Sequence, residues 1–485
     1  MITFEEAKEL SKGYKVVPIS MEIMSDIRTP MQVLRILKGV SSHCYMLESV
    51  ENQEKWGRYT FLGYDPKLEI TCTNGVMTVK NGKTEVSEVK HPGEKIKEIL
   101  KEYTSPKIKE LPTFTGGLVG YFSYDYIKYS EPKLNLDAND EEGFKDVDLM
   151  LFDKVIAFDN FSQKIIVIAN ARTENLREDY DRCVDEINKI IELIRTGEMV
   201  EVNPGKITSE FRPLFTEKEY CEMVEKAKHY IYEGDIFQVV LSNRLEADYE
   251  GSLLNAYRVL RTINPSPYMF YFSSDDIEVA GASPETLVKL EDGVLHTFPL
   301  AGTKPRGKNK EEDDELEKIL LTDEKERAEH NMLVDLGRND IGKISKFGTV
   351  EVENYMDILR YSHVMHIGST VKGEIRDDKT SLDAVDAVLP AGTLSGAPKI
   401  RAMEIINELE NNKRGIYGGA IGYIDFTGNL DTCIAIRTAF KKNGKVFVRS
   451  GAGIVADSVP KSEYNECINK AKAVMNAVSM GQESI

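Results

Sequence analysis

The sequence predicts an α/β or α+β fold with mixed sheets, in which helix content is close to strand content. Two observations predict it: strand-like runs with Asn-Gly turns dominate residues 1–200, and strands alternate with amphipathic helices after residue 213. No internal repeat interrupts this pattern. The chain has 485 residues, too many for one ordinary core, so two domains are expected.

Residues 1–205 are expected to form an N-terminal domain of strands followed by a helix. Two Asn-Gly dipeptides mark the tight turns of a meander, and a glycine-punctuated run indicates a strand at a close backbone approach. A helix with apolar residues at helical spacing closes this part. In chain order, the expected elements are strands at 59–63 and 68–73, turns at Asn74-Gly75 and Asn81-Gly82, strands at 114–124, 155–159 and 164–169, and the helix at 175–195.

Residues 206–485 are expected to form a second domain, after a boundary at 196–213 that is rich in glycine, proline and charge. A capping box of Thr216 and Glu219 predicts a helix start. The expected strands are 237–242, 268–272, 286–290, 418–423 and 430–440, and the expected helices are 253–263, 309–336 and the one that follows Pro460.

The composition is that of a soluble protein, with 41% hydrophobic and 29% charged residues. A net charge of −18 argues against a nucleic-acid-binding surface, which needs a basic stripe. No apolar run approaches membrane-spanning length, and the start of the chain has no signal-peptide pattern. The six cysteines lack Cys-x-x-Cys spacing, which argues against zinc and predicts free thiols in a reducing cytoplasm.

Two acidic pairs, Glu326-x-x-Glu329 and Glu463-x-x-Glu466, are the strongest chemical signal in the chain. Each stands near the start of a predicted helix, and a spacing of three places both carboxylates of a pair on one helix face. If the two helix starts converge, four carboxylates form a site for a hard divalent cation such as magnesium.

Each pair also has an ordinary structural explanation. Asp323 and Glu326 match a capping box, with Gly337 as the expected end of that helix. The second pair runs beside an apolar stripe, as residues of a solvated helix face do. The metal-binding interpretation of this pair is strengthened by the neighbouring Ser450-Gly451-Ala452-Gly453. We interpret this string as a glycine turn whose N–H groups face the helix start and suit an anion.

Several residues have two interpretations that the sequence leaves open. Residues 415–423 hold four glycines and two tyrosines, which indicates either a tight hairpin or a backbone that a ligand approaches, with Tyr417 in contact. Arg437 stands among apolar neighbours and would meet either a structural carboxylate or a substrate carboxylate. His363 and His366 suit metal ligation or a single acid–base role, and an ordinary core or surface histidine is the default for each.

Three short strings add candidate groups for an anionic ligand. Residues 390–399 read as a loop entering a helix, and residues 299–307 as a similar loop. Ser283-Pro-Glu285 places one carboxylate at the entrance of a strand.

Taken together, these strings resemble one family, the chorismate-utilising enzymes, and within it the anthranilate synthase branch. The resemblance spans nearly the whole chain, is strongest from residue 215 to residue 475, and implies a layered α/β/α sandwich of two large, mostly antiparallel sheets flanked by helices. The strings that carry it are, in the family's order, Gly234-Asp-Ile-Phe-Gln-Val-Val-Leu-Ser, Pro299-Leu-Ala-Gly-Thr-Lys-Pro-Arg-Gly, Glu329-His-Asn-Met-Leu-Val-Asp-Leu-Gly-Arg-Asn-Asp, Pro390-Ala-Gly-Thr-Leu-Ser-Gly-Ala-Pro-Lys and Arg449-Ser-Gly-Ala-Gly-Ile-Val-Ala-Asp-Ser.

The resemblance implies a magnesium-dependent site for chorismate. Glu329 and Glu466 resemble the direct magnesium ligands, and Glu326 and Glu463 resemble partners that back them through water. The ion would hold the ring carboxylate and stabilise charge that the reaction pushes onto it. The groups expected beside that carboxylate are Lys470 and the backbone of Gly451, Ala452 and Gly453.

The resemblance also implies roles around the rest of the substrate. Tyr417 and Arg437 resemble contacts to the enolpyruvyl carboxylate, with Thr393 in the same pocket. Glu285 resembles the acid that protonates the departing ring hydroxyl, which requires a raised pKa. His366 resembles the group that assists pyruvate elimination. The expected substrate-binding set also includes Ala301, Gly302 and Thr303.

Two positions separate the branches of this family. Gln238 stands where isochorismate and salicylate synthases carry a lysine that activates water, and glutamine suits ammonia as the incoming nucleophile. Ala301 stands where aminodeoxychorismate synthases carry a lysine, so no covalent ring–enzyme adduct can form there. Both favour anthranilate synthase, in which ammonia adds to the ring of chorismate, the hydroxyl leaves, and elimination of pyruvate gives the aromatic ring.

A second site is implied for feedback inhibition by tryptophan. Met46-Leu47-Glu48-Ser49 resembles the family's tryptophan-binding string, with Met46 in place of leucine, and Asn264-Pro-Ser-Pro-Tyr-Met269 resembles its other half. Glu48 would meet the α-ammonium group. The indole pocket would be lined by Pro267, Tyr268 and Met269, with Tyr423 contributing. An ordinary Pro-Ser-Pro turn before a strand is the alternative.

The sequence holds no nucleophilic-cysteine string of an amidotransferase. The chain alone is therefore expected to use free ammonia, and to receive ammonia made from glutamine by a separate amidotransferase subunit, anthranilate synthase component II, in a heterotetramer. Two rivals remain: aminodeoxychorismate synthase component I, whose product keeps its pyruvyl group, and a non-catalytic amino-acid-binding regulator with the same fold.

Overall fold

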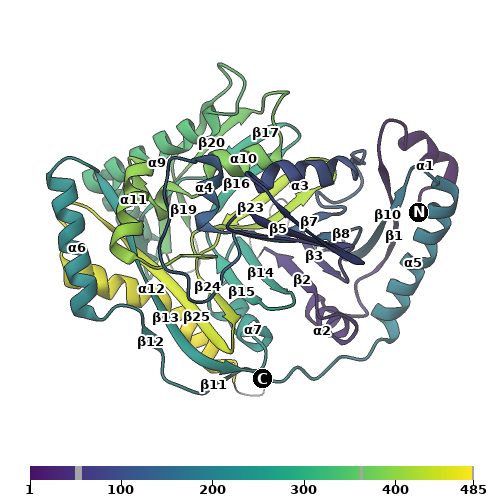
Figure 1. Cartoon of the computed structure of the whole chain (residues 1–485), viewed down its shortest axis with the longest axis horizontal. Coiled ribbons are helices and arrows are strands. Elements are labelled where there is room, and N and C mark those ends of the chain that lie inside the picture. The colour runs from purple at the N-terminus through teal and green to yellow at the C-terminus, as the bar shows by residue number, and fades with distance from the viewer. Residues whose placement is uncertain (50–56, 361–363, 483–485) are drawn as a thin grey trace.

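Two antiparallel sheets stacked face to face form the centre of the computed structural model, which describes residues 1–49, 57–360 and 364–482 (Figure 1). The mixed sheets expected from the strand pattern are wrong, because every pairing between named strands in these ranges is antiparallel. Tight turns such as Asn74-Gly75 and Asn81-Gly82 join neighbouring strands, and a hairpin connection makes its strands antiparallel. The two large antiparallel sheets implied by the family resemblance are confirmed.

The first sheet has 13 strands and joins the beginning of the chain to its end. Strand β2 pairs with β14, so residues on the two sides of the expected boundary near residue 205 share one sheet. In spatial order its strands are β1 (Val16–Met24), β10 (Lys164–Arg172), β9 (Lys154–Asp159), β3 (Tyr59–Tyr64), β2 (Cys44–Glu48), β14 (Tyr268–Ser273), β15 (Glu278–Ser283), β24 (Thr438–Lys442), β25 (Lys445–Ile454), β13 (Gln238–Glu250) and β11 (Lys206–Ile207), with β12 (Arg212–Pro213) and β21 (Gly396–Ala397) also on β13.

The second sheet has 12 strands and crosses the same boundary where β7 pairs with β22. Its strands are, in spatial order, β18 (Leu300–Pro305), β20 (Val364–Glu374), β17 (Val294–Thr297), β16 (Thr286–Glu291), β23 (Leu430–Ile434), β22 (Ala420–Asp425), β7 (Gly117–Phe122), β8 (Val147–Phe152), β4 (Leu68–Thr73), β5 (Val76–Asn81) and β6 (Lys83–Glu88), with β19 (Glu351–Arg360) on β20. The division into domains at residue 205 stays a prediction.

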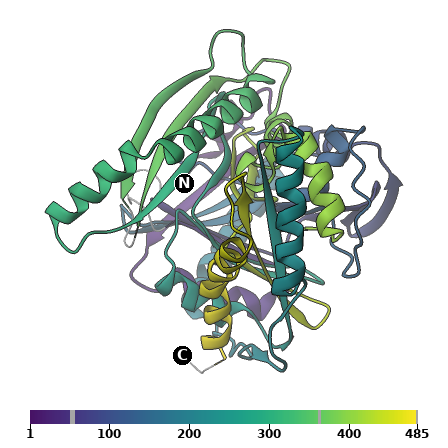
Figure 2. The same ribbon diagram turned by 90° about the vertical axis from the view of Figure 1, so that its left-hand side faces the viewer.

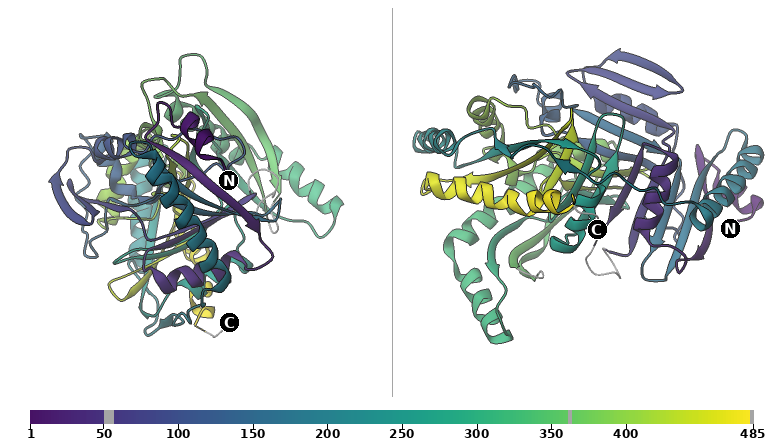
Figure 3. Two further views of the ribbon diagram at one scale, coloured as in Figure 1. Left: turned by 90° about the vertical axis from the view of Figure 1, so that its right-hand side faces the viewer. Right: turned by 90° about the horizontal axis from the view of Figure 1, so that it is seen from below.

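Helices cover the outer faces of both sheets (Figures 1 and 3). Aromatic side chains such as Tyr45, Phe152 and Phe270 fill the core between the sheets, while α2, α5, α7 and α12 pack on the first sheet and α3, α9 and α10 on the second. The helices are α1 (Phe4–Leu10), α2 (Pro30–Val40), α3 (Pro92–Lys101), α4 (Ile127–Ser130), α5 (Leu176–Thr196), α6 (Glu217–Tyr232), α7 (Leu254–Ile263), α8 (Lys310–Thr322), α9 (Glu324–Gly342), α10 (Ser381–Val388), α11 (Lys399–Glu410) and α12 (Pro460–Met480).

Three expected elements differ from the structure. The helix expected over 309–336 divides at Asp323 into α8, which extends outward in Figure 2, and α9, which packs on the second sheet, and Gly337 does not end α9. Residues expected as a loop at 299–307 form strand β18, paired with β20. The late strand expected at 430–440 divides into β23 in the second sheet and β24 in the first, so the chain changes sheet at residues 435–437.

None of the helices in the described ranges has the length and apolar character needed to cross a bilayer.

Candidate active site

The two acidic pairs lie near the starts of two helices that are within electrostatic range of each other. Glu326 and Glu329 belong to the start of α9, and Glu463 and Glu466 to the start of α12. The pKa of Glu463 is raised by burial, and the charge of Lys325 on α9 is among the groups that oppose this rise. Burial, and then the neighbouring Glu329, raises the pKa of Glu326, and burial, together with Glu466, raises that of Glu463. The two carboxylates of each pair therefore repel each other.

The chemistry of this carboxylate set fits magnesium. A divalent cation would relieve the burial of Glu326 and Glu463 and their repulsion by the other glutamate of each pair, and the donors are the oxygen ligands that magnesium prefers. In the described ranges, three ligand-type side chains approach within 4.8 Å of one another only at His43, Glu69 and Asp275. Lys80 already supplies a cation to that cluster. The glutamate pairs thus fit magnesium by their chemistry, but their carboxylate oxygens lie farther apart than the ligands around a bound ion do.

Glu326 reaches toward β18, and Asp323 caps the helix. The Oδ1 atom of Asp323 accepts from the backbone N–H groups of Lys325 at 3.1 Å and Glu326 at 3.2 Å. An Oε2 atom of Glu326 lies 3.1 Å from the position that a Cβ on Gly302 would take. Gly302 has φ +64°, and β18 bulges between Ala301 and Thr303. A side chain at 302 would be strained and would press on that carboxylate.

The glycines 451 and 453 belong to strand β25, so the turn expected there is wrong. They stand opposite Ser242 and Val240 of β13, whose own N–H groups donate to Glu410 and to the carbonyl of Ser395. These are therefore non-hydrogen-bonded pairs, and the N–H groups of both glycines point away from β13. Strand β24 covers that side of β25 only as far as Val448. Beyond Val448 the N–H groups of both glycines are therefore not covered by β24, and their binding of an anion stays a prediction.

Two side chains approach the same glycines. A Cβ at 451 would lie 2.9 Å from the Tyr417 hydroxyl, and one at 453 would lie 2.7 Å from Nε2 of Gln238. Lys470 on α12 donates to the Gly451 carbonyl at 3.2 Å and pairs with Glu466 at 2.6 Å. The Ala452 side chain packs instead in the core on the opposite face. Glycine is required at 451, because a Cβ there would also lie 2.7 Å from the backbone carbonyl oxygen of Leu241, whereas a Cβ at 453 would displace only the end of the Gln238 side chain.

Arg437 lies where the chain changes sheet, in a left-handed conformation with φ +53°. Its Nη1 donates to the Lys470 carbonyl at 2.7 Å, and in the described part of the chain no carboxylate pairs with it. Burial lowers the pKa of Arg437, and nearby Tyr417 opposes that shift. A partly buried guanidinium without a counter-ion favours the substrate-carboxylate interpretation over a structural salt bridge.

Glu285 lies at a second crossing between the sheets, between the end of β15 and the start of β16. Its Oε1 atom accepts from the Thr393 hydroxyl at 3.0 Å. Burial raises the pKa of Glu285 to about 7, although Thr393 and Lys470 both act to lower it. The two crossings are bonded to each other, because the N–H of Ile434 donates to the Glu285 carbonyl at 2.9 Å. A carboxyl that holds its proton near neutral pH is suited to general acid catalysis.

His366 on β20 faces β18. Its Nδ1 lies 2.8 Å from the Gly302 carbonyl and 3.1 Å from the Thr303 hydroxyl. A carbonyl can only accept, so Nδ1 carries the proton and Nε2 the lone pair. Burial lowers the pKa of His366, and the charge of Arg437 adds to this shift, so the ring is neutral. His363, the other histidine of that pair, lies outside the described residues.

The structure brings three of the predicted residues, Arg437, Glu466 and Lys470, to the wall of one open hollow. The hollow has a volume of about 560 Å³ and is lined by Arg437, Ser462, Asn465, Glu466, Asn469 and Lys470. Nothing in the sequence singled out Ser462, Asn465 and Asn469 as site residues. Their spacing of three and four places them on one face of α12 with Glu466, but exposed polar helix residues with that spacing are common.

The two predicted tryptophan-binding strings lie side by side. Glu48 of β2 stands opposite Met269 of β14 in the sheet, which places Leu47, Ser49, Pro267 and Tyr268 at the same junction. Tyr423 approaches from the second sheet, with its ring 4.5 Å from that of Phe114. The carboxylate of Glu48 is already occupied: it accepts from Arg261 Nη2 at 2.9 Å and from the Tyr257 hydroxyl at 2.6 Å. The sequence analysis missed both partners, which lie on α7.

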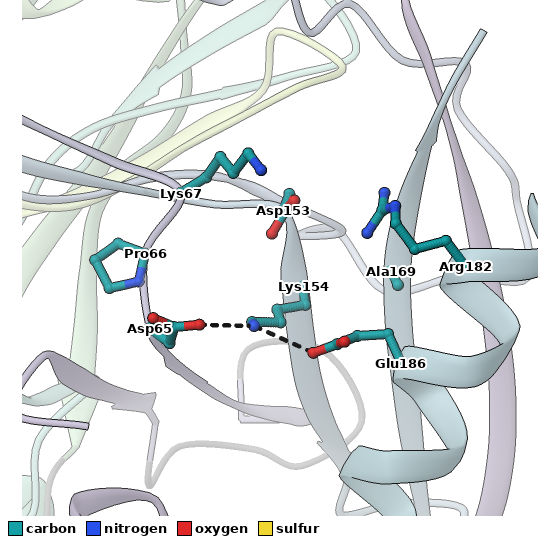
Figure 4. Close-up of a pocket in the computed structure, with 8 residues that line it drawn as sticks. All are labelled: Asp65, Pro66, Lys67, Asp153, Lys154, Ala169, Arg182 and Glu186. Atoms are coloured by element: carbon teal, nitrogen blue, oxygen red, sulfur yellow. Dashed lines mark hydrogen bonds and ion pairs between the residues drawn. The ribbon is translucent and has the colours of Figure 1, made fainter. Parts of the chain in front are cut away.

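Another hollow, of about 300 Å³, lies between α5 and the first sheet (Figure 4). Lys154 crosses it, with ion pairs of 3.2 Å to Asp65 and 3.2 Å to Glu186. Arg182 points toward Asp153 on its other side. These charges satisfy one another, and none of the residues that the sequence singled out lines this hollow.

Comparison with known sequences gives a consistent result. Residues 42–476 match the family described as chorismate binding enzyme. The chain is 48% identical to anthranilate synthase component 1 of Acetivibrio thermocellus, with 99% of each protein covered. It is 46% identical to anthranilate synthase component 1 of Aquifex aeolicus, over 100% of this chain and 99% of that protein.

Solved structures show the same fold. Anthranilate synthase component I from Streptococcus pneumoniae superposes with a TM-score of 0.77 at 39% identity, over 93% of this chain and 98% of that one. The menaquinone-specific isochorismate synthase from Escherichia coli superposes with a TM-score of 0.71 over 98% of each chain. At 17% identity, this second likeness bears on the fold alone.

Proposed function

This chain belongs to the family of chorismate binding enzymes, and on that premise we propose that it is the chorismate-converting component of an anthranilate synthase. It converts chorismate and ammonia to anthranilate and pyruvate. The observation that carries this proposal is Glu285, a partly buried acid whose pKa is raised to about 7, within the electrostatic reach of Lys470. Such an acid serves a reaction in which a hydroxyl must leave an anionic substrate.

The substrate would be held at its two carboxylates. Lys470 and the N–H groups of Gly451 and Gly453 neutralise the ring carboxylate, and Arg437 with Tyr417 binds the enolpyruvyl carboxylate. Both sets of donors are fixed before the substrate arrives, which lowers the cost of organising the site. Glu329 and Glu466 would hold a magnesium ion, backed by Glu326 and Glu463. When bound, that ion adds positive charge at the ring carboxylate.

Proton transfers follow from the positions of Glu285 and His366. Ammonia adds to the ring carbon beside the one that bears the carboxylate, and Glu285 donates its proton to the departing hydroxyl, which leaves as water. His366, neutral and held through Nδ1–H by the Gly302 carbonyl, presents Nε2 for the elimination of pyruvate. Gln238 lies against Gly453 and has no basic group, which suits ammonia better than water as the nucleophile.

Regulation and assembly belong to the same proposal. Tryptophan binds at the junction of β2 and β14 and inhibits the enzyme, with its α-ammonium group on Glu48. An amidotransferase subunit, anthranilate synthase component II, supplies ammonia from glutamine within a heterotetramer. All six cysteines are free thiols, which supports a reducing compartment, the cytoplasm.

A single assay tests the activity. Chorismate, magnesium and ammonium are incubated with the chain at mildly alkaline pH, and anthranilate fluorescence is followed. Anthranilate formation is the expected result. Accumulation of aminodeoxychorismate would instead assign the chain to aminodeoxychorismate synthase, and absence of turnover would make it a non-catalytic regulator.

A further inference from the structure

A small hollow lies on the α9 side of Glu285, separate from the open hollow that would receive the substrate. It has a volume of about 50 Å³, and its walls come from α9, from residues 297–299 and from the segment that carries Thr393. Glu285 and Thr393 line one part of it, and Asp340 of α9 lines another. The hollow therefore connects the proposed catalytic acid to a second buried carboxylate.

A few polar groups stand in this hollow among a largely apolar lining. Thr297 is only 5% exposed, and its Oγ1 has no hydrogen-bond partner in the part of the chain that the structure describes. An unpaired buried hydroxyl is costly, and a bound water needs roughly two to four polar partners, which Thr297, Thr393, Glu285 and Asp340 can supply. The volume of about 50 Å³ is several times the roughly 10–15 Å³ that one water requires.

The far end of the hollow leads toward solvent. Asp340 is 3% exposed and pairs with the partly buried Lys399 at 2.7 Å and with Lys343 at 3.2 Å. The side chain of Lys343 is 47% exposed. Asp340 thus stands between the hollow and an ammonium group in contact with bulk water.

We propose that this hollow holds a short chain of water molecules that returns a proton to Glu285 after each turnover. The inference rests on the proposed function, because only a reaction that uses Glu285 as an acid consumes its proton. In the chemical step, the O–H bond of Glu285 and the ring C–O bond break, and the proton leaves with the hydroxyl as water. The Glu285 carboxylate then takes a proton from the adjacent water, which is resupplied along the chain from solvent at the Asp340 end.

Gly337 and Gly342, both in α9, provide a matched pair of test variants. A Cβ at 337 would lie 3.0 Å from Thr297 Oγ1 and 3.5 Å from Pro299 Cγ, inside the hollow, whereas a Cβ at 342 meets no atom within 4 Å. Alanine favours the helix at both positions, so both variants should fold. Gly337→Ala should lower kcat by about tenfold with an unchanged KM for chorismate, as expected when a proton step is impaired. Gly342→Ala should behave as the wild type.

The pH profile and the ordered water distinguish this role from a packing defect. Removing water around Glu285 raises the pKa of its carboxyl, so the alkaline limb of the kcat profile should move to higher pH in Gly337→Ala and stay in place in Gly342→Ala. A high-resolution crystal structure of the wild-type chain should show water bonded to Thr297 Oγ1, and that of Gly337→Ala should lack it.

Three results would overturn the inference: a dry hollow in the wild type, equal kcat in the two alanine variants, or a lowered kcat in Gly337→Ala with an unmoved pH profile. If the wild type makes no anthranilate, the proposed function fails and the relay fails with it, whatever the crystal shows. If anthranilate forms and the hollow is dry, the relay alone fails.

Discussion

Replacing Thr393 with valine should move the alkaline limb of the pH–rate profile upward by about one pH unit. The Thr393 hydroxyl donates to Glu285 at 3.0 Å, and this bond favours the charged carboxylate. A hydrogen bond to a charged group contributes about 1.5 kcal/mol, which corresponds to about one pKa unit. The pKa of Glu285, about 7 in the native chain, would therefore rise to roughly 8 in Thr393→Val.

The activity change has a definite sign, because an acid catalyst works in its protonated form. Activity that depends on Glu285 is present below its pKa and lost as the pH rises through it. At pH 8, the protonated fraction of Glu285 would rise from about one tenth to about one half, so the variant should retain roughly fivefold more of its own maximal rate. The prediction concerns the position of the alkaline limb on the pH axis. It does not concern the maximal rate, because that rate also depends on how Thr393 positions the carboxyl.

The assay is initial-rate anthranilate fluorescence over pH 6–9, with free ammonia held constant by adjusting total ammonium at each pH. Thr432→Val serves as the control, because its buried hydroxyl donates to the Val288 carbonyl instead. An alkaline limb that stays in place in Thr393→Val, or that moves to lower pH, would refute the assignment of that limb to Glu285.

Three further predictions test the remaining parts of the site. Glu329→Gln or Glu466→Gln should abolish anthranilate formation and the magnesium-dependent rise in Tm, while calorimetry still detects tryptophan binding; a full magnesium shift in both variants would contradict the assignment. Glu285→Gln should remove a pH dependence of stability: because burial raises the pKa of Glu285 from 4.5 to about 7, the wild type is stabilised below pH 4.5 and loses up to roughly 3 kcal/mol as the pH rises to 7. Urea unfolding of the wild type and of Glu285→Gln at pH 4.5 and pH 8 measures this difference. An equal change in the free energy of unfolding between the two pH values in both proteins would exclude it. Ser49→Ala or Met269→Ala should weaken tryptophan inhibition with activity retained, and Arg261→Gln should strengthen it about fivefold, because it releases the Glu48 carboxylate from an ion pair that contributes about 1 kcal/mol; unchanged inhibition in all three would disprove a tryptophan site at this junction.

The sequence predicted most single elements because their signals are local. The capping box at Thr216, the Asn-Gly turns and the apolar spacing of α5 all act within a few residues, and each is present in the structure. Sheet membership is not local. The run at 430–440 has the pattern of one continuous strand, and only the packing of two sheets determines that it divides at residues 435–437.

The chemistry of the site was predictable for the same reason, and its supporting contacts were not. Residue types such as the glutamate pairs carry a signal by themselves, whereas Arg261 on Glu48 lies 213 residues away in the chain. The glycines 451 and 453 show the difference clearly. Exposed N–H groups for an anion were expected there from a turn, but the structure has a strand edge that β24 leaves uncovered beyond Val448.

Two of the places where the chain crosses between the sheets have a mechanical consequence. Glu285 and Arg437 belong to neither sheet but to two of the short connectors that join them, so each side chain takes its position from both layers at once. The residues proposed to bind tryptophan are also divided between layers, with Glu48 and Met269 on one and Tyr423 on the other. A ligand that changes the separation or tilt of the layers would therefore displace the acid and the arginine together. With this arrangement, a distant effector can change the active site without moving a loop, because a change in the distance between the sheets is enough.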